Sequence, residues 1–141
     1  MLNTISRALE NFCIHQLNAK YIPTDEISKK RTLIAYIDID TKNKQKYRVY
    51  IVSDQNFIQR VSKLFLEEDE SDEETLIDMA LEITNLIVGS AKVMAEELNE
   101  NPYTIQTPHF LQIDIFDFEY DNAKTLTIED DKITIAIKEL N

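Results

Sequence analysis

Residues 72–98 carry the longest run of helical periodicity in the chain, and this run constrains the fold more than any other feature. Apolar side chains recur there every three or four residues, which predicts one long helix that ends before the segment 99–102. The apolar side of this helix consists of Leu76, Met79, Ala80, Ile83, Ile87, Met94 and Leu98, flanked by Ile77, Leu81, Val88 and Ala95. A helix with one apolar side needs a sheet or other helices to cover it.

Alternating apolar and polar residues predict the sheet. Residues 32–40 and 47–52, separated by a polar turn, predict a hairpin. Residues 110–120, 124–129 and 132–138 predict three further strands. In the first of these the apolar phase changes at Ile115–Phe116, which predicts a bulge or a segment buried on both faces.

Two more helices complete the predicted architecture. Residues 2–19 have helical spacing, and a shorter helix, capped by Ser53 or Asp54, is expected to end near Leu66. The acidic segment Glu67–Glu74 is expected to be a solvated loop that brings negative charge to the next helix N-terminus, and a binding role for it stays open. The order of elements predicts one α+β domain over residues 1–141, with the helices on one face of a mostly antiparallel, five-stranded sheet.

Composition excludes several classes of function. With 26 acidic and 15 basic residues the net charge is −11, which argues against nucleic acid and anionic membrane surfaces as partners. A single glycine leaves no phosphate-binding glycine loop, and one cysteine with two separated histidines gives no metal-ligand spacing. We expect His15 and His109 to be surface or half-buried residues and Cys13 to lie in the core. The lone cysteine fits a reducing cytoplasm.

The polar side of the long helix contains the one candidate site. Asp78, Glu82, Asn85, Gly89, Lys92 and Glu96 fall within a narrow sector, here called the outward stripe. Gly89 is the only glycine of the chain, and a glycine inside a helix costs about 1 kcal/mol relative to alanine. Its missing side chain would leave a notch that another backbone could approach. The simpler interpretation is an ordinary solvated helix surface.

The spacing of the outward stripe resembles a known family. Asp78, Glu82 and Asn85, followed after 22 intervening residues by Pro108, are similar to the motif of the CheC/CheX/FliY phosphatases of bacterial chemotaxis. The string EITNLIVGSAK, residues 82–92, resembles the corresponding helix of CheX-like members. Leu86 departs from the methionine that often follows the asparagine. The motif occurs once here, as in CheX-like members, whereas CheC-like members carry it twice.

The resemblance implies a reaction and a partner. The substrate would be the aspartyl phosphate of a phosphorylated CheY-type response regulator, which supplies its own Mg²⁺, so no cofactor is expected in this chain. Asn85 would orient the attacking water, and Glu82 would pair with a lysine of the receiver. Asp78, Gly89 and Lys92 would contribute to docking, whereas Pro108 would be a structural turn. The resemblance also implies a homodimer formed by joined sheets.

Two other functions remain open on the sequence. The same helix face could dock a receiver domain or a flagellar switch component without catalysis, as an adaptor does. The chain could also be an acidic scaffold without a receiver partner.

Overall fold

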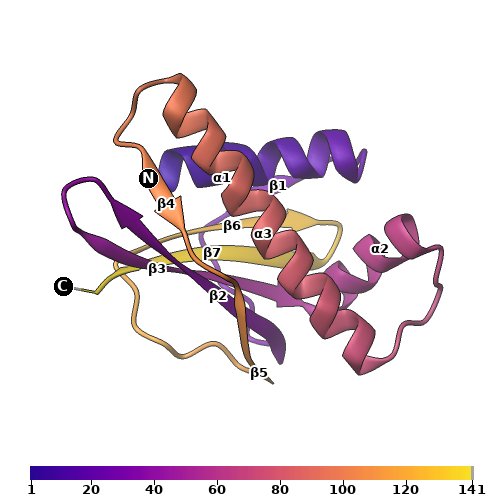
Figure 1. The fold of residues 1–141 in the computed structure, drawn as a ribbon. Coiled ribbons are helices and arrows are strands. Elements are labelled where there is room, and N and C mark those ends of the chain that lie inside the picture. Colours follow the sequence, from indigo (N-terminus) through magenta and orange to yellow (C-terminus); the bar gives the residue numbers. More distant parts are fainter. Residues whose placement is uncertain (141) are drawn as a thin grey trace.

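The computed structural model describes residues 1–140, which form three α-helices, one π-helix and one sheet (Figure 1). The helices are α1 (Leu2–Asn11), η1 (Phe12–Gln16), α2 (Gln55–Leu66) and α3 (Glu73–Glu97). The strands are β1 (Ile22–Thr24), β2 (Thr32–Thr41), β3 (Lys46–Asp54), β4 (Tyr103–Ile105), β5 (His109–Asp114), β6 (Asn122–Ile128) and β7 (Asp131–Glu139).

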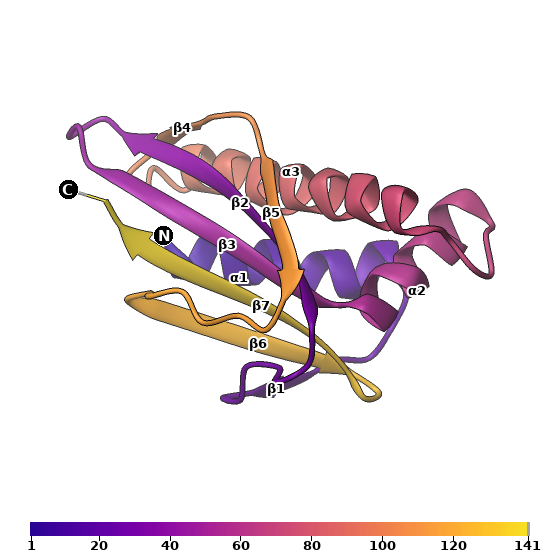
Figure 2. The same cartoon turned by 90° about the horizontal axis from the view of Figure 1, so that it is seen from below.

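The sheet is antiparallel throughout and all helices cover one of its faces (Figure 2). Its strand order is β1-β6-β7-β3-β2-β4, and β5 also pairs with β2. The predicted α+β architecture is confirmed, including the hairpin of β2 and β3. The predicted number of strands is wrong, because the sheet has seven strands and not five. The two missed strands, β1 and β4, are only three residues long each.

The main core lies between the helices and the sheet. Leu33, Ile37 and Ile39 of β2 point into it, as the alternation of the sequence predicts, together with residues of β3, β6 and β7. From the helices it receives apolar residues of α1, α2 and α3, and Cys13 lies there fully buried. Burial of this apolar surface is the main force that holds the helical layer on the sheet.

A second, smaller core occupies the helix-free face of the sheet. Ile34, Tyr50 and Val52 point to this side, and Phe116 covers them with its ring 5.4 Å from that of Tyr50. The predicted change of phase at Ile115–Phe116 is therefore real, but it follows the end of β5 and is not a bulge within a strand. The bulge lies earlier, at Leu111, where the register of β5 against β2 shifts.

The first helix departs from the regular helix expected over residues 2–19. After Asn11 it continues as the π-helix η1, in which the N–H of Leu17 donates to the carbonyl of Phe12 at 3.1 Å. The chain leaves this helix at Asn18, which has a left-handed backbone conformation with φ of 48°. Hydrophobic spacing did not predict the change of helix type.

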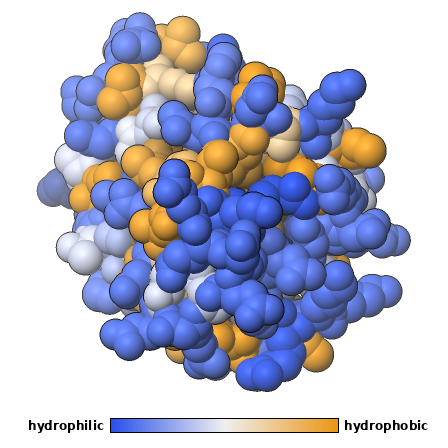
Figure 3. Space-filling view, turned by 90° about the vertical axis from the view of Figure 1, so that its right-hand side faces the viewer, coloured by the Kyte–Doolittle hydropathy of each residue, from blue (hydrophilic) through white to orange (hydrophobic). Residues whose placement is uncertain are grey.

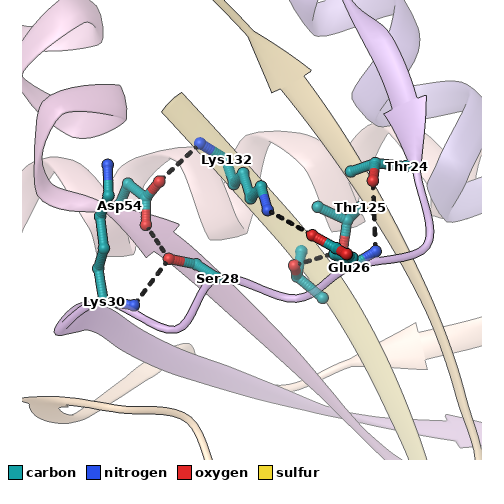
Figure 4. A network of polar contacts seen from close by, with 8 residues as sticks. Thr24, Glu26, Ser28, Lys30, Asp54, Thr125 and Lys132 are labelled. Carbon is teal, nitrogen blue, oxygen red and sulfur yellow. Dashed lines mark hydrogen bonds and ion pairs between the residues drawn. The ribbon is translucent and has the colours of Figure 1, made fainter. Parts of the chain in front are cut away.

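A buried polar network ties the end of β3 to two other segments (Figure 4). Asp54 occupies the N-cap position of α2, yet its side chain does not cap the helix, and neither does that of Ser53. Instead, the Asp54 carboxylate accepts hydrogen bonds from the hydroxyl of Ser28 and, at 2.8 Å, from the backbone N–H of Lys132. The predicted capping role is wrong because these nonlocal donors take both carboxylate oxygens.

We expect Asp54→Ala to lower the free energy of unfolding by about 2–3 kcal/mol, since it leaves one buried and one partly buried donor without an acceptor. Urea unfolding followed by circular dichroism measures this change. Asp130→Ala, which removes an exposed carboxylate from the neighbouring turn, is the matched control and should stay within about 0.5 kcal/mol of the wild type. Equal losses in the two variants would contradict the role of the network.

Candidate active site on the long helix

Helix α3 begins at a well-defined cap. The side chain of Asp72 accepts a hydrogen bond from the backbone N–H of Thr75 at 2.8 Å. Hydrogen bonds from the side chain and the backbone of Thr75 lower the pKa of Asp72 below its usual value, so the cap stays charged at neutral pH. Glu73 and Glu74 add negative charge to the first turn, where the helix dipole favours it.

One side of α3 is buried as predicted, against the sheet and the neighbouring helices. Ile83, Ile87 and Val88, all in the predicted set, are fully buried. Thr84, which was not in that set, is buried as well, and its hydroxyl donates a hydrogen bond to the carbonyl of Ala80. Leu98 is the exception: it was expected on the buried side but is 47% exposed. The helix ends at Glu97, so Leu98 lies past the last turn that packs on the sheet.

The opposite side of α3 is the outward stripe, and the structure exposes most of it, as predicted. Asp78, Glu82 and Asn85 are exposed, Gly89 is half-buried, and Lys92 lies one turn further along. Apart from the adjacent residues and the backbone of α3 itself, a Cβ atom built on Gly89 has no atom within 4 Å. The packing of the fold therefore does not require a glycine here, because the methyl group of an alanine would fit without a steric clash.

The polar groups at the centre of the stripe are unengaged within residues 1–140. Neither Asp78 nor Glu82 forms an ion pair, and the amide of Asn85 makes no side-chain hydrogen bond there. Lys92 instead pairs with Glu96 at 3.6 Å, a contact between neighbouring turns of the helix. The site thus presents a carboxylate and an amide one turn apart, beside a position that lacks a side chain.

Pro108 belongs to another part of the molecule. It is half-buried in the connection between β4 and β5 and comes directly before the first residue of β5. Proline fixes the backbone at the entry to this strand.

Residues outside α3 are poorer candidates for a nucleophile, an acid-base group or a metal ligand. Burial raises the pKa of the Cys13 thiol to about 12, so this thiol is not a nucleophile at neutral pH. His15 is exposed on η1, and His109 is exposed and stacks on the ring of Tyr36 at 5.2 Å. Among residues 1–140, no three or more His, Cys, Asp or Glu side chains are grouped so that they could hold a metal ion.

None of the helices within this range is long and apolar enough to cross a membrane.

The sequence did not identify the surroundings of the stripe. A cavity of about 270 Å³ opens beside it, lined by residues of α1, η1, α2 and α3. The lining residues come from segments far apart in the sequence, so no local pattern brings them together. In the sequence, the apolar Leu86 directly after Asn85 is the signal that could have indicated it, and it is 39% exposed; Phe65 lies between Leu64 and Leu66, which are exposed as well.

Comparisons with known proteins agree with this fold. CheX of Vibrio vulnificus superposes with a TM-score of 0.79 at 17% identity, over 96% of this chain and 95% of that chain. CheX of Desulfovibrio desulfuricans gives a TM-score of 0.76 at 17% identity, over 98% and 97% of the two chains. A complex of CheX with CheY, beryllofluoride and Mg²⁺ from Borrelia burgdorferi gives 0.62 at 17% identity, over 98% and 95%.

At these identities the structural likeness shows a shared fold, and the sequence comparison adds the family. A comparison with curated proteins finds no match. The family model described as chemotaxis phosphatase CheX matches residues 35–129, which is more than half of the chain and includes the whole outward stripe. This chain, with its single Asp78–Glu82–Asn85 helix on a CheX-like fold, therefore belongs to the CheX family of chemotaxis phosphatases.

Proposed function

We propose that this chain is a phosphatase that accelerates hydrolysis of the aspartyl phosphate of a CheY-type response regulator. The observation that carries the proposal is the exposed, unengaged pair of Glu82 and Asn85 beside Gly89 in a chain of the CheX family. The CheX relative solved together with CheY, beryllofluoride and Mg²⁺ supports the choice of partner. Such a receiver would bring its own Mg²⁺, and an enzyme that acts on it would work in the cytoplasm.

Asn85 would act on the attacking water. Phosphoryl transfer passes through a loose transition state, so positioning of the water and neutralisation of charge matter more than a strong base. The carbonyl oxygen of the Asn85 amide can accept a hydrogen bond from the water and hold it in line with the leaving aspartate. A neutral amide does this without adding negative charge beside the phosphoryl oxygens.

Glu82 would set the angle at which the receiver docks. Its exposed carboxylate lies one turn before Asn85 on the same side of α3 and has no partner within residues 1–140. An ion pair with a lysine of the receiver would fix this end of the helix against the receiver's active site. Asp78 and Lys92 lie further along the stripe in the two directions and would tune the docking electrostatics.

The chemical proposal predicts different losses at the two central residues. Asn85→Ala should lower kcat by about 100-fold or more and leave most of the affinity for the receiver, since a group that acts on the transition state is removed. Asn85→Asp should be at least as inactive, because its carboxylate would face the phosphoryl oxygens. Glu82→Ala should mainly raise KM. Phosphate release from phosphorylated receivers, with and without each variant, measures these effects.

Two outcomes would contradict this assignment. Activity like that of the wild type in Asn85→Ala or Asn85→Asp would remove Asn85 from the mechanism. Binding of activated receivers without any acceleration of phosphate release by the wild type would identify an adaptor in place of an enzyme.

Gly89 allows a test that touches no chemical group. Replacement of a glycine inside a helix should stabilise the fold by about 0.5–1 kcal/mol, and a Cβ atom at Gly89 meets no neighbouring side chain or segment within 4 Å. We therefore expect Gly89→Leu to melt at a higher temperature than the wild type while it binds the receiver weakly and loses phosphatase activity. Calorimetry and the phosphate-release assay measure the two properties. A variant with both raised stability and full turnover would show that Gly89 is not a docking notch.

We further propose that two chains form a homodimer by joining their sheets. The edge strand β5 spans His109–Asp114 and pairs only with β2 among residues 1–140, so its other side can accept a strand. The opposite edge, β1, is three residues long and contains Pro23, which disfavours further pairing. Light scattering at micromolar concentration should give about twice the chain mass of 16.5 kDa. A mass of one chain over that range would contradict the dimer.

A further inference from the structure

A cavity of about 270 Å³ lies between α1, η1, the C-terminal end of α2 and the middle of α3. Its lining includes Phe12 and His15 of η1, Phe65 of α2, and Leu86, Ser90 and Met94 of α3. The volume is slightly below the range of roughly 300–1,000 Å³ that is usual for sites that enclose a small molecule. A depression of this size suits one side chain of a larger partner.

The cavity is a largely apolar surface, with Asn11, His15, Gln16 and Ser90 as its polar lining residues, in an acidic molecule. Leu86 is 39% exposed and Phe65 is 36% exposed, and the ring of Phe65 meets that of Phe12 edge-to-face at 6.2 Å. None of the lining residues is acidic, although the chain carries a net charge of −11. Figure 3 shows hydrophobic side chains gathered among hydrophilic ones on the side of the molecule that includes α2. An apolar side chain that binds to such a surface is stabilised by the removal of apolar area from water.

An unusual helix forms one wall. Phe12, His15 and Gln16 of η1 line the cavity, and they belong to the π-helix. A π-helical turn is rare and occurs frequently at functional sites. The periodicity of residues 2–19 predicts a regular α-helix, which would be enough to bury the apolar side of this segment. The π-helical turn is therefore not needed for core packing, and it changes the shape of this wall of the cavity.

The cavity is continuous with the outward stripe. Leu86 follows Asn85 and Ser90 follows Gly89, so these two lining residues lie about 100° around α3 from residues of the stripe. The cavity therefore adjoins the notch at Gly89, within reach of a partner that is seated there. A second copy of this chain seated there would block Asn85, whereas a receiver would fill the cavity while presenting its phosphoryl group to Asn85.

We propose that this cavity receives one apolar side chain of the phosphorylated receiver and thereby selects which receivers are dephosphorylated. This inference rests on the proposed phosphatase function and adds a specificity site to it. The side chain enters between Phe65 and Leu86 and loses contact with water there. Receivers that carry a charged residue at that position are disfavoured, because the lining holds no Asp, Glu, Lys or Arg side chain that could pair with it, only the polar groups of Asn11, His15, Gln16 and Ser90 beside the apolar walls.

The proposal can be tested by a substitution that fills the cavity at a position that is not one of the proposed catalytic residues. Ser90 is exposed, so Ser90→Phe can be accommodated without disturbing the core and places a ring in the space of the incoming side chain. Asn56→Phe adds the same ring to an exposed position in the first turn of α2, away from the cavity, and is the matched control. Both variants are compared with the wild type in melting temperature, mass, affinity for a receiver activated with beryllofluoride and Mg²⁺, and phosphate release.

We expect Ser90→Phe to raise KM and the dissociation constant by about tenfold or more, with little change in kcat, because the loss is one of binding. Asn56→Phe should match the wild type. Alanine substitutions of apolar surface residues of the receiver then identify the occupant: at one position the loss should be much smaller with Ser90→Phe than with the wild type, as a double-mutant cycle measures.

Several results would overturn the proposal. Unchanged KM in Ser90→Phe, with an active wild type, would overturn the specificity site and leave the phosphatase function intact. A loss confined to kcat, or additive effects at every receiver position, would do the same. A change of mass in Ser90→Phe would indicate that a second copy occupies the cavity. A wild type that neither binds nor dephosphorylates any receiver would overturn both proposals together.

Discussion

The packing of α3 on the sheet determines the rest of this structure. Ile83, Val88 and Ala91 are fully buried between the helix and the layer below it. Since the rotation of the helix about its axis is fixed by this face, the direction of Glu82, Asn85 and Gly89 is fixed as well. The site needs no further support from loops: it is a row of side chains on a rigid element, which is the arrangement that holds a water or a partner to a defined geometry.

The remaining elements support this layer from two sides. The helix-free face of the sheet is covered by Phe116 and its aromatic neighbours, so β2 and β3 are buried on both faces near their centres. Asp54 joins the start of α2 to β7 and to the segment before β2 through buried hydrogen bonds. α2 is thereby held where its C-terminal end, with Phe65, reaches the neighbourhood of α3.

Local patterns in the sequence predicted the parts of the fold that depend on local periodicity. The buried and outward sides of α3 follow from its spacing, and the alternation of β2 identified the residues that face the helices. Patterns did not predict β1 and β4, because strands of three residues carry too few alternations to be recognised and exist only through their pairing partners. Leu98 was misplaced because the end of a helix depends on its cap, which periodicity does not report.

The candidate site also has a part that the sequence predicted and a part that it did not predict. Its polar centre was visible in the sequence, since Asp78, Glu82, Asn85 and Gly89 lie on one helix. The adjoining cavity was not, because it is assembled from η1, α2 and α3, and because the π-helical turn at Phe12 depends on backbone hydrogen bonding that side-chain patterns do not encode. Similarly, Asp54 looked like a helix cap until its nonlocal partners, Ser28 and Lys132, were located.

We propose that an activated receiver docks on the outward side of α3. Nuclear magnetic resonance spectra of the isotope-labelled chain, recorded while a receiver activated with beryllofluoride and Mg²⁺ is added, identify the docking surface. We expect the largest chemical-shift changes on residues 78–96 and on the neighbouring walls formed by η1 and the end of α2. Shifts concentrated on the helix-free face of the sheet, around Tyr36 and Phe116, would contradict it.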